Sequence, residues 1–358
     1  MAIVFMESFD YWSDIFVHGY TRDSNSRDNY YGWISAGGGR GGSNAFMSQR
    51  GQYGAFAPFG TALSTATVGF WFNQVGIRSA EAQYNFGLMS GTTFMISYQI
   101  QQDGTMIVYR GRGTAELGRT ASGLFTPGAR YIETKVKIDP SVGTVELRSN
   151  GATILSLTGK NTGSGTISGF AFSASYNDSS SQDIYYDDMY VTDETPPNAG
   201  FLGDIRVEYL VPTGAGVKTQ FTPSTGSNWQ TVDEITTPSD TDYNSASTLG
   251  AMDLFGMQNL AGNGLVYGVQ TDIRTKKDDA GHRRVKPVFY KASGSGETSR
   301  FYAGSQSPVL DTFINSPIQI YNTSPDTGVA WTVDEVNALQ YGYAVGEAGM
   351  FTIDAKLV

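Results

Sequence analysis

The sequence has no cysteine, only two histidines and few charges. The lack of cysteine excludes disulfides, thiolate zinc sites, iron–sulfur clusters and a thiol nucleophile. Charged residues make up 16% of the 358 residues, the net charge is −10, and the pI near 4.7 argues against a nucleic-acid binder, which presents a basic face. No window of about 20 residues is apolar enough to span a membrane. Because the first residues lack a basic segment and a long apolar run, we expect no signal peptide and synthesis in a cytosol.

The sequence is instead rich in glycine (44), tyrosine (21) and phenylalanine (20), residues that serve turns and pleated surfaces. Short runs alternate between apolar and polar residues, and turn residues separate them. Asp103-Gly104 and Asn150-Gly151 each lie between two such runs, a strong hairpin signal. The strands predicted in the first half are residues 67–72, 93–100, 105–109, 131–139, 143–148 and 152–157. Their spacing of about 8–12 residues is typical of a sandwich or barrel.

Pro196-Pro197 cannot continue a central strand, so we predict two domains, residues 1–197 and 198–358. In the second domain we expect a short helix within residues 247–261. The motif Thr332-Val333-Asp334-Glu335 matches a capping box and predicts a second short helix. The strands predicted there are residues 204–211, 264–275, 285–292 and 317–321. The predicted fold class is therefore all-β, with a smaller second β-sandwich domain carrying one or two short helices.

The motifs that could carry catalysis are weak. His18 and His282 are interpreted as structural or solvated, because no Gly-x-Ser-x-Gly elbow accompanies them. The glycine run at residues 37–42 lacks the lysine and the strand-to-helix context of a phosphate loop, so it predicts a flexible loop or a tight backbone crossing. We therefore expect no nucleotide cofactor.

Carboxylate pairs bear on catalysis because sandwich folds include glycosidases, which need two acids in one groove. The candidates are Glu133, the pair Asp187/Asp188 and the pair Asp193/Glu194. Glu133 has no acid two residues away, and adjacent residues such as Asp187 and Asp188 should point to opposite faces of a strand. We therefore predict no catalytic residues and a protein that is not an enzyme.

Residues 177–183 offer oxygen ligands but match no calcium motif, which favours a solvated turn. No metal site is predicted. Aromatic rings can stack on sugar faces, and two clusters supply them. The glycan-binding candidates are Tyr30, Tyr31, Trp33, Tyr176, Asn177 and Asp178. Instead of binding a glycan, either cluster could form the edge of a buried core or a contact between subunits.

Residues 1–197 resemble the concanavalin-A-like, laminin-G-like jelly-roll sandwich. The segments that carry the resemblance are residues 7–10, 130–138, 143–151 and 184–191, the last an acidic pair followed by an apolar strand. The second half resembles a region of tailed-phage structural proteins. That resemblance rests on residues 221–229, 232–234, 240–243 and 324–332.

These resemblances imply a structural protein of a phage virion. It would be a compact tail component (short fibre, spike or receptor-binding protein) or a capsid decoration protein. The expected partners are other virion proteins, further copies of the chain with a trimer preferred, and a host surface glycan. Neither nucleic acid nor membrane insertion is expected. The alternatives are a polysaccharide-degrading glycoside hydrolase and a free carbohydrate-binding module on the same sandwich.

Overall fold

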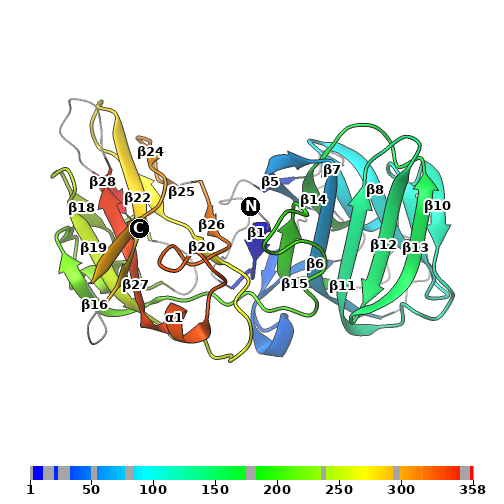
Figure 1. The fold of residues 1–358 in the computed structure, drawn as a ribbon, viewed down its shortest axis with the longest axis horizontal. Helices are drawn as coiled ribbons and strands as arrows, with labels where there is room; N and C mark the ends of the chain where they lie inside the picture. Colours follow the sequence, from blue (N-terminus) through cyan, green and yellow to red (C-terminus); the bar gives the residue numbers. More distant parts are fainter. Residues whose placement is uncertain are drawn as a thin grey trace. The chain divides into compact units, whose positions relative to one another are not determined.

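The computed structural model describes residues 3–10, 20–22, 33–49, 55–76, 84–174, 183–234, 239–292, 299–315, 317–346 and 355–357. The chain divides into two compact units, residues 1–207 and 208–358. Antiparallel strands dominate both of them (Figure 1), which confirms the predicted all-β fold class. None of the helices in these described residues is long and apolar enough to cross a membrane.

The first unit contains an eight-stranded and a seven-stranded sheet. In the larger sheet the strand order is β13-β12-β11-β6-β15-β4-β3, and β1 also pairs with β15. Its strands are β1 (Ile3–Glu7), β3 (Trp33–Ser35), β4 (Ala45–Gln49), β6 (Thr65–Val75), β11 (Gly128–Lys137), β12 (Gly143–Ser149), β13 (Ala152–Lys160) and β15 (Asp183–Thr192). In the smaller sheet the order is β10-β9-β8-β7-β14-β5-β2. Its strands are β2 (Thr21–Arg22), β5 (Ala55–Leu63), β7 (Tyr84–Ser90), β8 (Thr93–Ile100), β9 (Met106–Arg110), β10 (Ala115–Arg119) and β14 (Ile167–Ala174).

One aromatic-rich core lies between these two sheets. Phe70 from β6 contacts Phe86 from β7 and Phe170 from β14, with ring centroids 5.0 and 5.1 Å apart. Alternate residues of each strand point to one face, so the alternation in the sequence sends these rings inward. Both predicted hairpins are present, as β8–β9 and as β12–β13. Asn150 has a positive φ at the second turn, as a tight hairpin turn requires.

The sequence predicts a strand at residues 204–211, and this prediction is wrong for the whole segment. Residues 201–211 form no ladder, and β16 begins only at Pro212. The segment is extended, with exposure that alternates along residues 204–208. Several of its backbone groups bond to side chains of the first unit instead of a neighbouring strand. We call residues 201–207 the connector.

The second unit contains sheets of six, five and two strands. In the six-stranded sheet the order is β16-β19-β27-β22-β23, and β24 also pairs with β22. Its strands are β16 (Pro212–Thr219), β19 (Met252–Met257), β22 (Arg283–Lys291), β23 (Arg300–Ala303), β24 (Ser307–Val309) and β27 (Leu339–Val345). The five-stranded sheet contains β17 (Thr222–Pro223), β18 (Asn244–Ala246), β21 (Arg274–Lys276), β25 (Ile314–Asn315) and β28 (Ala355–Leu357). The third sheet pairs β20 (Val269–Thr271) with β26 (Gln319–Tyr321).

The helix expected within residues 247–261 is absent, because that stretch contains strand β19, which pairs with β16 and β27. Its apolar spacing fits either period, and strand neighbours on both sides decide the outcome. The helix expected after Thr332 is confirmed as α1 (Val333–Ala338). Half of the capping box forms, since the Thr332 hydroxyl accepts from the Glu335 amide at 3.1 Å. The Glu335 carboxylate accepts from the Ser324 hydroxyl.

Candidate functional site: a buried carboxylate network under the connector

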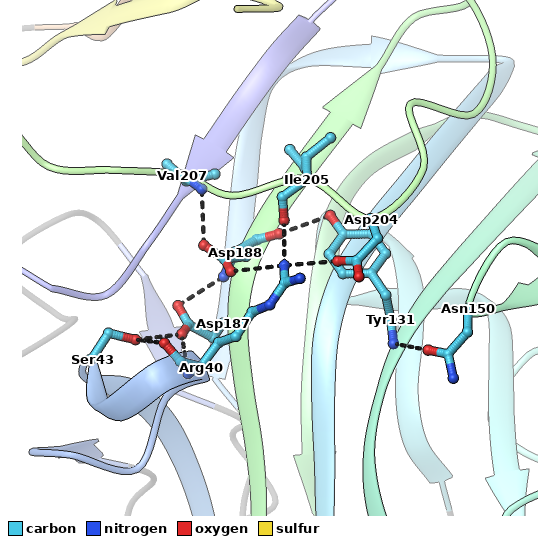
Figure 2. A network of polar contacts seen from close by, with 9 residues as sticks. All are labelled: Arg40, Ser43, Tyr131, Asn150, Asp187, Asp188, Asp204, Ile205 and Val207. Carbon is cyan, nitrogen blue, oxygen red and sulfur yellow. Dashed lines mark hydrogen bonds and ion pairs between the residues drawn. The ribbon is translucent and has the colours of Figure 1, made fainter. Parts of the chain in front are cut away.

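The acidic pair Asp187-Asp188 lies in a bulge of β15. The ladder between β15 and β6 shifts register between Asp187 and Tyr190, and Asp188 has a φ of 48°. Both carboxylates therefore enter one polar network (Figure 2). The prediction that they point to opposite faces is wrong, because it assumed a regular strand, and a bulge redirects a side chain.

Each carboxylate is buried and hydrogen-bonded. Oδ2 of Asp187 accepts from the backbone N–H of Arg40 and from the Ser43 hydroxyl, both at 2.8 Å. Its Oδ1 accepts from the backbone N–H of Asp188, also at 2.8 Å. Oδ1 of Asp188 accepts from the backbone N–H of Val207 in the connector at 2.8 Å. The two residues are only 1% and 4% exposed, so solvent and substrates are excluded from both.

Arg40 ties this pair to the connector. Its Nη1 lies 3.5 Å from Oδ2 of Asp188 and 2.7 Å from Oδ1 of Asp204, and it donates to the Ile205 carbonyl at 2.8 Å. Arg40 begins the short 3-10 helix η2 (Arg40–Gly42) within the glycine run. Of the two alternatives predicted for this run, Gly39 fits the close backbone approach, because a Cβ there would overlap the backbone carbonyl oxygen of Asn44 and lie 2.6 Å from Oδ2 of Asp187.

Glu133 holds a second point of the connector. Its Oε1 accepts from the Tyr190 hydroxyl at 2.5 Å and from the backbone N–H of Gly203 at 2.8 Å. The Tyr190 hydroxyl also accepts from the backbone N–H of Leu202 at 2.9 Å. Gly69 lies between Glu133 and Tyr190 in the sheet, and a Cβ there would overlap the Tyr190 ring. A glycine in the middle of β6 thus lets Tyr190 reach across the sheet to Glu133.

Burial controls the charge of the acidic pair. It raises the pKa of the Asp187 carboxyl, and the adjacent Asp188 raises it further. Burial also raises the pKa of Asp188. The hydrogen bond from the Val207 N–H and the positive charges of Arg40 and Arg206 lower it, but burial has the larger effect. The pair therefore takes up a proton more readily than two solvated aspartates. Because the connector and Arg40 cover it, this chemistry serves to hold the connector.

Most of the glycan-binding candidates lie outside the described residues. These are Tyr30, Tyr31, Tyr176, Asn177 and Asp178. His18, interpreted as structural or solvated, also lies outside them. Trp33 begins β3, where its backbone pairs with Met47.

The remaining polar candidates have ordinary surroundings. Glu194 accepts from Thr67 and Lys135, and Asp193 accepts from Thr195. His282 is exposed between β21 and β22. Of the loop weighed as a calcium site, residues 177–182 are not described, and Asp183 begins β15. Within the described parts of the chain, no group of three or more His, Asp or Glu residues is arranged to hold a metal ion.

Sequence reasoning missed Arg40, Asp204 and Val207 as members of the network. One signal was present, since Arg40 is the only charged residue in the stretch from residue 29 to 49. Nothing in the sequence pairs it with Asp188, which lies 148 residues away.

No protein-family model and no curated protein matches this chain. Several solved structures match this chain at low similarity. Cellulose induced protein Cip1 is 13% identical, with 49% of this chain and 91% of that one covered and a TM-score of 0.37. Domain 4 of AbnA, a GH43 extracellular arabinanase from Geobacillus stearothermophilus in complex with arabinotriose, is 20% identical. The match covers 53% of this chain and 92% of that one, with a TM-score of 0.38. Botulinum neurotoxin type C, whose cell entry depends on interaction with two ganglioside molecules, is 9% identical, with 95% of this chain and 97% of that one covered and a TM-score of 0.33. Values this low leave the function to be inferred from the chain's own residues.

Proposed function

We propose that this protein is a structural component of a tailed-phage virion, in which the first unit recognises a host surface glycan and the second docks on the particle. The sequence resemblances of both halves support this proposal. The observation that favours binding over hydrolysis is that all three acids are already engaged: Glu133 and Asp188 hold the connector, and Asp187 holds the backbone of Arg40. A tail location (short fibre, spike or receptor-binding protein) and a capsid decoration role are both consistent with it.

A glycosidase needs two carboxyl groups that reach the scissile bond from opposite sides. A general acid or base must also come within about 3 Å of the proton that it transfers. Glu133 is 1% exposed, and its Oε1 already accepts two hydrogen bonds. Asp187 and Asp188 lie under Arg40 and the connector, so a polysaccharide could reach them only after the connector had left.

Immunogold electron microscopy of purified phage particles, with an antibody against this chain, tests the virion role. We expect label on the particle. A handful of copies per virion would indicate the tail, and hundreds would indicate the capsid. Particles without label, from a lysate in which the chain is readily detected, would refute the virion role.

Glycan binding is tested with the purified protein on an array of bacterial surface polysaccharides. We expect binding that falls about fivefold or more in Trp33→Ala or Tyr176→Ala, since losing a stacking ring removes about 1 kcal/mol or more. Val142→Ala, which changes an exposed residue outside both clusters, is the control. Binding that is unchanged in both ring variants would contradict these site residues.

The hydrolase alternative is tested by incubating the protein with host capsule and measuring the release of oligosaccharides. We expect none. Release that is abolished in Asp187→Asn would instead establish an enzyme.

A further inference from the structure

Charge is unevenly distributed in the second unit. Eight of the ten lysines and arginines of residues 208–358 lie between Arg274 and Arg300, and only Lys218 and Lys356 lie elsewhere. Four of the eight have acidic partners. These ion pairs are Arg274 with Asp240, Arg283 with Asp279, and Lys291 and Arg300 with Asp326. Lys276 lies over the Phe313 ring, and Lys277 donates to the Gly281 carbonyl.

Arg284 and Lys286 remain, and neither forms an ion pair with any residue that the structure describes. They lie two positions apart on β22 and therefore share one face of the six-stranded sheet. Arg284 is exposed and Lys286 is partly exposed. On the same face Tyr290 pairs across strands with Phe301, whose ring lies 4.9 Å away and which is 46% exposed. We call Arg284, Lys286 and Phe301 the basic face. Phe301 lies further along this face than the two cations, opposite Tyr290. Arginine and exposed aromatic residues are among the types that anchor protein interfaces.

A group of acids in the same unit lacks cations. Asp233, Glu234 and Asp242 form no ion pair with the described residues. Ser239 joins two of them, because its backbone N–H donates to Glu234 and its hydroxyl accepts from the Asp242 amide. We call these three acids the acidic cluster.

The acidic cluster and the basic face lie on opposite sides of the six-stranded sheet. Val232, next to the acidic cluster, packs on the apolar group that contains Val285 and Tyr343. Val285 lies between Arg284 and Lys286 and points the other way. The two charged surfaces of one molecule therefore cannot neutralise each other.

We infer that the basic face of one copy binds the acidic cluster of the next, in a head-to-tail contact between second units. A two-fold contact of the basic face with itself would place like charges together. A head-to-tail contact is heterologous and closes into a ring when the rotation allows it. This inference deepens the homo-oligomer expected for the proposed virion role, because it names the surfaces involved.

Sedimentation velocity of the full chain tests the contact. We expect an oligomer in 0.1 M NaCl and a monomer in 1 M NaCl, because the Debye length falls from about 10 Å to about 3 Å. The variant Arg284→Glu/Lys286→Glu should be monomeric in 0.1 M NaCl. The control Lys137→Glu/Lys160→Glu makes the same charge change in the first unit and should assemble like the wild type. A wild type that is monomeric at both salt concentrations, or a basic-face variant that assembles normally, overturns the inference.

A mixing experiment distinguishes loss of the contact from misfolding of a variant. Asp233→Lys/Asp242→Lys reverses the acidic cluster, and this variant should also be monomeric alone. Mixed one to one with the basic-face variant it should form oligomers, since each contact then joins opposite charges again. Two folded variants, verified by circular dichroism, that stay monomeric in the mixture would overturn the inference. All these measurements use the purified chain, so their outcome is independent of whether the chain is found on particles.

Discussion

Replacing Arg40 with methionine should release the connector from the strands of the first unit that it lies against. The substitution keeps the apolar stem of the side chain and removes the guanidinium that lies 3.5 Å from Asp188 and 2.7 Å from Asp204. The side chain of Asp188 is only 6% exposed, so the substitution leaves its carboxylate without its ion-pair partner in a poorly solvated place. Such a buried, unpaired charge is strongly destabilising.

The magnitude follows from the geometry. At 3.5 Å and an effective dielectric constant of about 20, Coulomb's law gives about 5 kcal/mol for the Arg40–Asp188 pair. Removing one partner of a buried pair typically costs about 3–5 kcal/mol. Because the Arg40 side chain is 22% exposed, water can partly replace it, and we expect the low end, about 3 kcal/mol. The contact with Asp204, which is 51% exposed, adds at most about 1 kcal/mol.

Urea denaturation combined with hydrogen exchange measures this loss for each unit separately. Arg40→Met should lower the unfolding free energy of the first unit by about 3 kcal/mol and speed exchange of the Val207 amide. Adding Asp188→Asn, which removes the orphaned charge, should recover about 2 kcal/mol. Arg119→Met, which breaks the exposed pair with Glu116, is the control and should change stability by less than about 1 kcal/mol. The reasoning is refuted if Arg40→Met costs no more than Arg119→Met, or if Asp188→Asn recovers nothing.

Three further predictions follow from single residues. Gly69→Ala should destabilise the first unit by about 2 kcal/mol in urea denaturation, because the new Cβ overlaps the Tyr190 ring; unchanged stability would mean that the ring moves freely. Tyr190→Phe should speed hydrogen exchange of the Leu202 and Gly203 amides. The Tyr190 hydroxyl accepts from the Leu202 amide, and it donates to the same Glu133 oxygen that accepts from the Gly203 amide. Equal exchange rates in the variant and the wild type would contradict this. Burial raises the pKa of Asp272 to about 7, so the stability that its proton provides is complete below about pH 4 and is lost as the pH rises through 7. Between pH 5 and 7 the second unit should lose up to about 1.4 kcal/mol per pH unit, measured by hydrogen exchange, and Asp272→Asn should flatten that slope.

The hairpins were predictable because the information in them is local. Alternation of period two identifies a strand, and Asp103-Gly104 and Asn150-Gly151 supply the backbone angles of the turns. The α1 helix was also predictable, since Thr332 caps the amide of a residue only three positions along the chain. The same alternation misled at residues 204–211, because it reports which side chains are buried and not which groups bond to the backbone.

The carboxylate network could not be predicted, because its contacts join distant parts of the chain. Whether Asp187 and Asp188 share a face depends on a register shift against β6, which the sequence near them does not reveal. Arg40 and Asp188 are 148 residues apart in the sequence, and Glu133 and Gly203 are 70 residues apart.

By itself, then, the sequence determined the class of protein: cysteine-free, acidic and rich in the alternating strands and tight turns of a β-sandwich. Period and turn chemistry act over a few residues, so they can be read along the chain. The role of the acids depends on contacts between distant parts of the chain. The bulge in β15 turned a pair expected to diverge into a single buried anchor, because pairing between strands, and not local preference, sets where each carboxylate points.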